Sequence, residues 1–189
     1  IPVMRKARAY LKSTQFRDKS AVDYGGIGYG KTTRADLSNG AFAAEALYYT
    51  EYLDQEPLAK DPEVQKQNKQ MWTAMQEFLT KVQNLPETNK QPYVSEDPRD
   101  RGGFIYRPNE SKAGSRDGKD KTTALVSSGS MTYAGLKSMI YAGLTQKDPR
   151  VKAAMDYLKK NYTLTENPGM GAQGHYYYLH VMSRALQAY

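Results

Sequence analysis

The sequence predicts an all-α protein in which helical hairpins stack in two layers, as a single domain over residues 1–189. One pattern occurs three times: a one-sided amphipathic helix, a glycine-containing turn, and a helix that is apolar most of the way round. A helix with one apolar stripe faces water on its other side, whereas a helix that is apolar all round is covered on several sides. The one-sided helices should therefore form an outer layer and the others an inner layer.

The first copy of the pattern begins with a helix over residues 2–14. Its apolar positions share one face, with Pro2 in the first turn: Val3, Met4, Ala7, Tyr10 and Leu11. Glycines at 25, 26, 28 and 30 then predict a turn with positive φ angles. They lack the spacing of a phosphate-binding loop. Asp36, Ser38 and Asn39 are all suitable N-cap residues for a second helix over residues 38–53.

The second copy begins at Asp61-Pro62, a cap followed by a favoured first helical residue, and should end before Leu85-Pro86. Residues 86–126 predict a long irregular segment. Within it, residues 107–126 are rich in charge and glycine, so we expect a mobile charged loop. An apolar helix over residues 127–144 completes this copy.

The third copy repeats the Asp-Pro helix start at Asp148-Pro149, and its glycine turn lies at residues 167–171. A last helix is expected over residues 172–188. The ends of the three one-sided helices align: Ala9-Tyr10-Leu11…Gln15, Glu77-Phe78-Leu79…Gln83 and Asp156-Tyr157-Leu158…Tyr162.

Composition narrows the function classes. The chain has no cysteine, which excludes disulfides, thiolate zinc sites and cysteine nucleophiles. Its net charge of +7 comes from scattered Lys and Arg without a dense basic run, so we expect a solvated basic surface and no nucleic-acid partner. No apolar run approaches the about 20 residues of a membrane span. The chain begins with Ile1, as expected of a processed or truncated product. Periplasmic, secreted and cytoplasmic locations all stay open.

These motifs resemble the α/α-toroid repeats of squalene-hopene cyclases and protein prenyltransferase β subunits. The resemblance covers nearly the whole chain, and is greatest to bacterial squalene-cyclase-like repeat proteins of unassigned function. It rests on GGIGYGKTTRADLSN, GSMTYAGLKSMIYAGL and NPGMGAQGHYYYLH. A closed toroid of this family needs six or seven hairpins, so about three repeats imply an open arc or part of a larger toroid. Partners would then be the remaining repeats of a longer chain or a second copy.

The resemblance also implies where a catalytic acid would stand. Cyclases of this family protonate an alkene with an acidic DxDD motif, and the matching residues here are Asp36-Leu37-Ser38-Asn39. Ser38 occupies the place of the proton donor, so the cyclase reaction is not expected at this site. Prenyltransferases bind zinc with Asp, Cys and His. Without cysteine, and with His175 and His180 on different sides of a helix, we expect no metal and no cofactor.

The leading hypothesis is a non-catalytic module with a tyrosine-rich concave surface that binds an isoprenoid, a lipid or a glycan. The alternative is a divergent terpenoid cyclase, prenyltransferase-like or carbohydrate-active enzyme of the same fold. An enzyme should place Asp36 or Glu45 in a cavity, whereas a binding module should show Asp36 capping its own helix and Glu45 paired or solvated. The bias toward tyrosine, 16 against 4 Phe, suits such a surface. Lys31, Arg34 and Lys137 could bind an anionic group. The candidate catalytic residues are Asp36 and His175, and the candidate ligand-binding residues are Tyr29, Asp36, Asn39, Tyr106, Tyr133, His175, Tyr177 and Tyr178.

Overall fold

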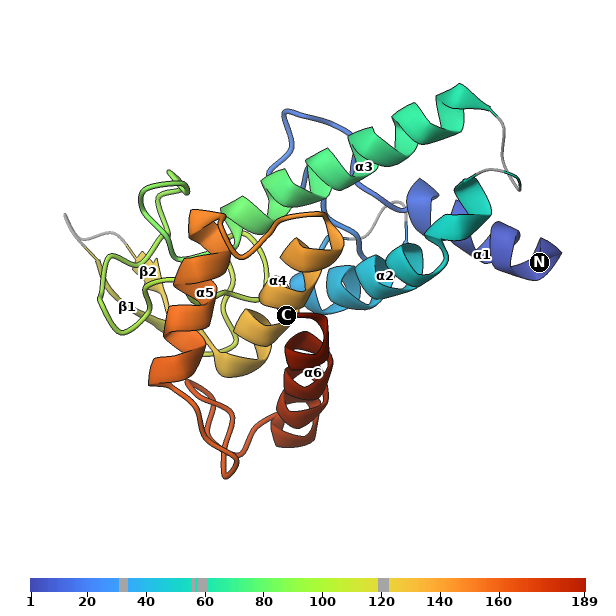
Figure 1. Cartoon of the computed structure of the whole chain (residues 1–189). Coiled ribbons are helices and arrows are strands. Elements are labelled where there is room, and N and C mark those ends of the chain that lie inside the picture. The colour runs from blue at the N-terminus through green and yellow to red at the C-terminus, as the bar shows by residue number, and fades with distance from the viewer. Residues whose placement is uncertain (31–33, 56, 58–60, 119–122) are drawn as a thin grey trace.

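The computed structural model describes residues 1–30, 34–55, 57, 61–118 and 123–189 (Figure 1). Six α-helices, one 3-10 helix and two short strands lie in this part of the chain. Their bounds are α1 Pro2–Ser13, α2 Leu37–Tyr49, η1 Glu51–Asp54, α3 Pro62–Lys81, β1 Ser115–Asp117, β2 Thr123–Leu125, α4 Gly129–Tyr141, α5 Pro149–Lys160 and α6 His175–Ala188. The predicted helical class is therefore confirmed in outline.

The two strands were not predicted. β1 and β2 pair antiparallel within the segment expected to be irregular, with Arg116 opposite Ala124. Three-residue strands are too short to show a readable alternation of polar and apolar residues. The expected mobility of residues 107–126 stays a prediction, and residues 119–122 of that loop lie outside the described part of the chain.

Helix α4 lies at the centre of the molecule, with α2 and α6 packed on two of its sides and α5 on another (Figure 1). Nearly all of its residues are buried, including Lys137. This agrees with the apolar character predicted for residues 127–144. The starts of α3 and α5 also follow the prediction, because the side chains of Asp61 and Asp148 accept hydrogen bonds from backbone N–H groups of the first turn.

Helix α1 differs from its prediction. Its expected core face is open to solvent: Val3 is 79% exposed and Tyr10 57% exposed. The one buried residue of α1 is Arg8, whose guanidinium bonds Asp54 of η1, 2.6 Å away, and also Thr50 and the carbonyl of Leu47. The chain therefore attaches α1 through a polar contact together with Leu11, which is partly buried against the core, and leaves most of its apolar stripe uncovered.

Two glutamines fix the junctions between one-sided helices. The side-chain amide of Gln15 donates to the carbonyls of Gly25 and Met71, at 3.0 and 2.9 Å. That of Gln83 donates to the carbonyls of Gly102 and Arg150, at the same two distances. Each glutamine thus joins the end of one helix, the following glycine turn and the next one-sided helix.

The glycine turns bring the backbone close to that next helix. Gly25 and Gly102 both have φ of +85°, and a Cβ at either position would overlap a helix carbonyl oxygen, that of Ala74 or Ala153. Only a residue without a Cβ fits this approach. Positive φ was expected in the first glycine turn, and Gly25 adopts it, whereas the other glycines of that turn do not.

Candidate functional site

Asp36 lies buried at the N-terminus of α2, where it caps the helix. Its Oδ1 accepts the backbone N–H of Asn39 at 2.8 Å, and its Oδ2 accepts the Asn39 side-chain amide at 2.7 Å. The side chain is 1% exposed. Both oxygens of Asp36 are therefore bonded, and Asn39 is bound to Asp36 instead of facing a ligand.

Hydroxyl groups of two tyrosines lie around this cap. Tyr106 has its pKa raised to about 12, first by burial and then by the charge of Asp36 and a hydrogen bond to it. The hydroxyl of Ser38 bonds that of Tyr177 at 3.1 Å. Burial raises the pKa of Tyr177, against the opposite effect of Ser38. Tyr29 is 77% exposed nearby, and its charge would act on Tyr106. These five side chains form one polar-aromatic cluster at the start of α2.

The other candidate residues form a second group, at the start of α6. Tyr178 is buried and stacks on His175 with ring centroids 6.3 Å apart, and its ring lies tilted against that of Tyr133 at 5.7 Å. Tyr178 donates its hydroxyl to the carbonyl of Thr163 at 2.8 Å. His175 Nε2 lies 3.0 Å from the carbonyl oxygen of Leu164. Burial raises the pKa of Tyr133. Tyr133 and Tyr178 therefore pack into the core, while the contacts of Tyr178 and His175 with residues 163 and 164 hold the turn before α6.

A third arrangement was missed in the sequence. Phe42 and Tyr49 of α2, both half-exposed, lie opposite His180 and Arg184 of α6. The Phe42 ring stacks on His180 with centroids 5.9 Å apart, and the Arg184 guanidinium lies 5.9 Å from the ring centre of Tyr49. We call these four side chains, together with Tyr177, the α2–α6 aromatic surface.

An ion cluster lies beneath this surface. Glu45 of α2 binds Lys137 of α4, with Nζ 2.6 Å from Oε2, and Arg184 of α6, with Nε 2.7 Å from Oε1. Lys137 is fully buried and lies 5.4 Å from the ring centre of Phe42. Burial acts to raise the pKa of Glu45, but the two cations outweigh it and hold that pKa below its usual value. Glu45 is therefore an ionised link between three helices.

A periodic signal could have identified these residues. Phe42, Glu45 and Tyr49 follow the spacing i, i+3, i+7, and so do Tyr177, His180 and Arg184. Each set defines one helix face. The sequence does not reveal that the two faces meet, because α2 and α6 are more than a hundred residues apart along the chain.

Of the three residues expected to bind an anion, two are paired with carboxylates of the protein itself. Arg34 is 3.4 Å from Glu110, and Lys137 is paired with Glu45. Lys31 lies outside the described residues. Among the residues that the structure describes, no group of three or more His, Cys, Asp and Glu side chains could hold a metal ion. No helix there is both long and apolar enough to cross a membrane.

Comparisons with protein-family models, with curated proteins and with solved structures found no match for this chain. The site must therefore be interpreted from its own geometry.

Proposed function

We propose that this chain is a binding module built as an α/α-toroid-like repeat, with α1, α3 and α5 in an outer layer and α2, α4 and α6 in an inner layer. Its ligand would be an isoprenoid, a lipid or a glycan, and the α2–α6 aromatic surface would hold it. Exposed aromatic rings beside polar groups suit such ligands, because a ring face binds an apolar chain or the C–H face of a sugar while hydroxyl, imidazole and guanidinium groups bond its polar parts.

The observation that carries the proposal is the state of the two candidate acids. Both carboxylate oxygens of Asp36 are bonded within the cap of α2, and Glu45 is paired with two cations. Alkene protonation needs a carboxyl group that stays protonated in an apolar site. The lowered pKa of Glu45 is the opposite condition. Ser38, at the position of the family's proton donor, is bonded to Tyr177. This arrangement favours binding over the alternative, a divergent enzyme of the same fold.

The test is direct binding to the purified chain by isothermal titration calorimetry. The panel is squalene in detergent, a prenyl diphosphate and neutral oligosaccharides, each with product analysis. We expect one class to bind, without turnover, and Phe42→Ala to weaken it about tenfold, a loss typical of a central aromatic contact. Tyr10→Ala on α1 is the matched control, since that ring is also exposed but is not part of the α2–α6 aromatic surface. Turnover would favour the enzyme; equal effects of both variants would contradict the proposed surface.

The open face of α1 supports a second part of this proposal, that another repeat or a second copy packs there. When the sequences of α1 and α3 are aligned at their matching ends, Val3 aligns with Met71 of α3 and Tyr10 aligns with Phe78. Met71 and Phe78 are buried, at 3% and 2% exposure, close to the preceding glycine turn. Light scattering against concentration tests for a second copy, and Tyr10→Glu should reduce any self-association.

A further inference from the structure

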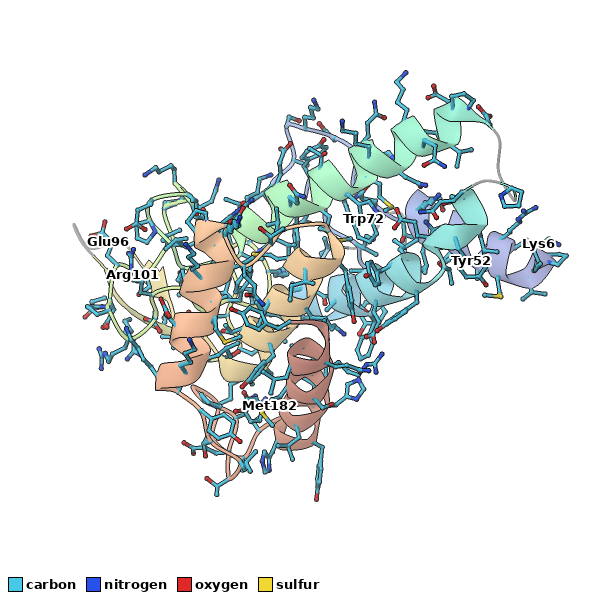
Figure 2. All side chains as sticks on the ribbon, viewed as in Figure 1. Lys6, Tyr52, Trp72, Glu96, Arg101 and Met182 are labelled. Carbon is cyan, nitrogen blue, oxygen red and sulfur yellow. The ribbon has the colours of Figure 1, made fainter. Side chains whose placement is uncertain are left out.

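A basic groove runs between α1, residues 15–24 and α3, apart from the α2–α6 aromatic surface. It consists of two adjoining pockets of about 550 and 450 Å³, which share Arg17, Gln67 and Met71 in their walls. Figure 1 places α1 and the N-terminal part of α3 at the same end of the molecule, and Figure 2 labels Lys6 and Tyr52 there. The two pockets form one elongated depression on the outer side of the helices.

Most of the protein's excess positive charge is gathered in this groove. Its walls carry seven Lys or Arg side chains and two carboxylates, Asp54 and Glu77, and Glu63 pairs with Lys66 at 3.4 Å, which leaves a net charge of +4 in a chain whose net charge is +7. The seven cations are Arg5, Arg8, Lys12, Arg17, Lys19, Lys66 and Lys69. The scattered basic residues of the sequence are thus brought together by the fold.

The inner end of the groove is built on a buried arginine. Arg8 is 3% exposed, and its Nη2 has no hydrogen-bond partner. Its neighbour Lys12 shares the same carboxylate, Asp54. The single negative charge of Asp54 therefore neutralises only one of the two cations, and this end of the groove keeps a net positive charge. Asn68, buried beside them, donates to Asp54 at 3.1 Å, which fixes the carboxylate in place.

The outer end carries donors that the protein does not use itself. The side chains of Lys19, Lys69, Gln67 and Gln70 have no hydrogen bond or ion pair within the described part of the chain. On α1, Arg5, Arg8 and Lys12 share one face over about 10 Å of helix. Cations spread over this length suit a ligand with several negative groups along a chain, because a single small anion could reach only one or two of them.

We propose that this groove binds a linear acidic polysaccharide. Arginine bonds carboxylate and sulfate groups through its planar pair of N–H groups. The neutral amides and Thr73 between the cations can bond sugar hydroxyls. Single-stranded nucleic acid is typically held by several aromatic rings on which bases stack. Here the walls hold one ring, Tyr24, with the Lys81 ammonium already 5.7 Å from its centre. A uronic acid polymer is therefore the better match.

The experiment measures binding of the intact chain to polygalacturonate oligomers at low and at physiological salt. The probes for comparison are neutral dextran oligomers and a single-stranded oligodeoxynucleotide with the same number of charges. We expect polygalacturonate to bind best and to weaken as salt rises, because exposed charges are screened. The double variant Lys66→Gln, Lys69→Gln should lose about tenfold in affinity, since each exposed pairing contributes modestly.

The matched control is Lys152→Gln, Lys159→Gln, which removes two exposed lysines from α5. It should leave binding within about twofold. Equal losses in the two double variants would show a general charge effect and overturn the groove as the site. Tighter binding of the oligonucleotide would overturn the ligand class, and equal binding of dextran or no binding at low salt would overturn the proposal as a whole. None of these outcomes depends on the α2–α6 aromatic surface.

Discussion

The first two glycine turns of this protein differ from the third, although all three follow a one-sided helix that ends in an aromatic residue and a leucine. In the first two, a buried glutamine donates to the glycine turn and to the next one-sided helix. In the third, Tyr162 stands in the place of the glutamine and is 60% exposed. No helix of the described chain packs on the third turn in this way. The helix ending alone does not make a junction; a following helix must supply the carbonyl.

The two complete junctions agree in register. The carbonyls of Met71 and Arg150 accept the glutamine, and three residues later Ala74 and Ala153 meet the glycine of the turn. Gly169 of the third turn has a similar φ of +83° but faces the carbonyl of Ser127 instead. The same backbone conformation therefore serves two different contacts.

The largest expected effect follows from removing a glycine at a complete junction. Gly102→Ala would place a Cβ against the carbonyl oxygen of Ala153 at a φ of +85°. Left-handed strain and overpacking together should lower the free energy of unfolding by about 3–5 kcal/mol. Gly114→Ala is the matched control, because it has the same φ with open space around it, and should cost about 1–2 kcal/mol. Urea unfolding measures both; equal costs would contradict the importance of the close approach.

A smaller loss is expected from the glutamine itself. Gln83→Leu leaves the carbonyls of Gly102 and Arg150 without their donor in a buried site, which should cost about 2–3 kcal/mol. The cost is limited because Gln83 Oε1 has no partner to lose. Gln15→Leu should cost a similar amount, whereas the exposed Gln173→Leu should change the free energy of unfolding by less than about 0.5 kcal/mol. A cost below that of the control would show that the junction is held by packing alone.

The second junction should also depend on acid, through Asp148 at the start of α5. A hydrogen bond from Arg150 lowers the pKa of Asp148, against the effect of burial, and Arg150 also bonds Thr80 of α3 at 3.0 Å. Because the folded pKa is lowered, this contribution is present above the unfolded pKa near 4 and is lost as pH falls through the folded value. Asp148→Asn keeps a capping residue and removes only the charge.

The difference in unfolding free energy between the protein and Asp148→Asn should be about 0.5–1 kcal/mol at pH 7, and should vanish toward pH 2. Asp156→Asn, an exposed carboxylate on the same helix without an ion pair in the described chain, is the control and should give no such slope. The first junction has Met71 where the second has Arg150, so it lacks this pair. A pH-independent difference would mean that Asp148 acts only as a cap.

The sequence predicted the elements of these junctions better than their contacts. Asp-Pro starts, glycine turns and helix endings depend on neighbouring residues. Helices α3 and α4 lie within their expected ranges, and α5 begins at its expected start. The apolar face of α1 was expected to be buried, but Arg8 decides its packing by bonding Asp54 of η1. The site was harder to predict, because Phe42 meets His180 only after α4 brings α2 and α6 together. Asp36 was one of three cap candidates, with Ser38 and Asn39, and it is the residue that caps α2.

The smallest expected effect comes from a substitution at the third turn. It tests whether this turn lacks a junction because it has no glutamine or because no further helix packs on it. Tyr162→Gln restores the residue found at the other two junctions, yet no carbonyl of a following one-sided helix lies there in the described chain. An exposed amide then bonds only water, so the free energy of unfolding should change by less than about 0.5 kcal/mol. The measurement compares the urea unfolding midpoint of Tyr162→Gln with that of the reverse substitution, Gln83→Tyr. Gln83→Tyr should lower the free energy of unfolding by as much as Gln83→Leu. If Tyr162→Gln stabilised the chain by more than about 1 kcal/mol, glutamine alone would suffice, and the third turn would be a junction that one substitution can complete.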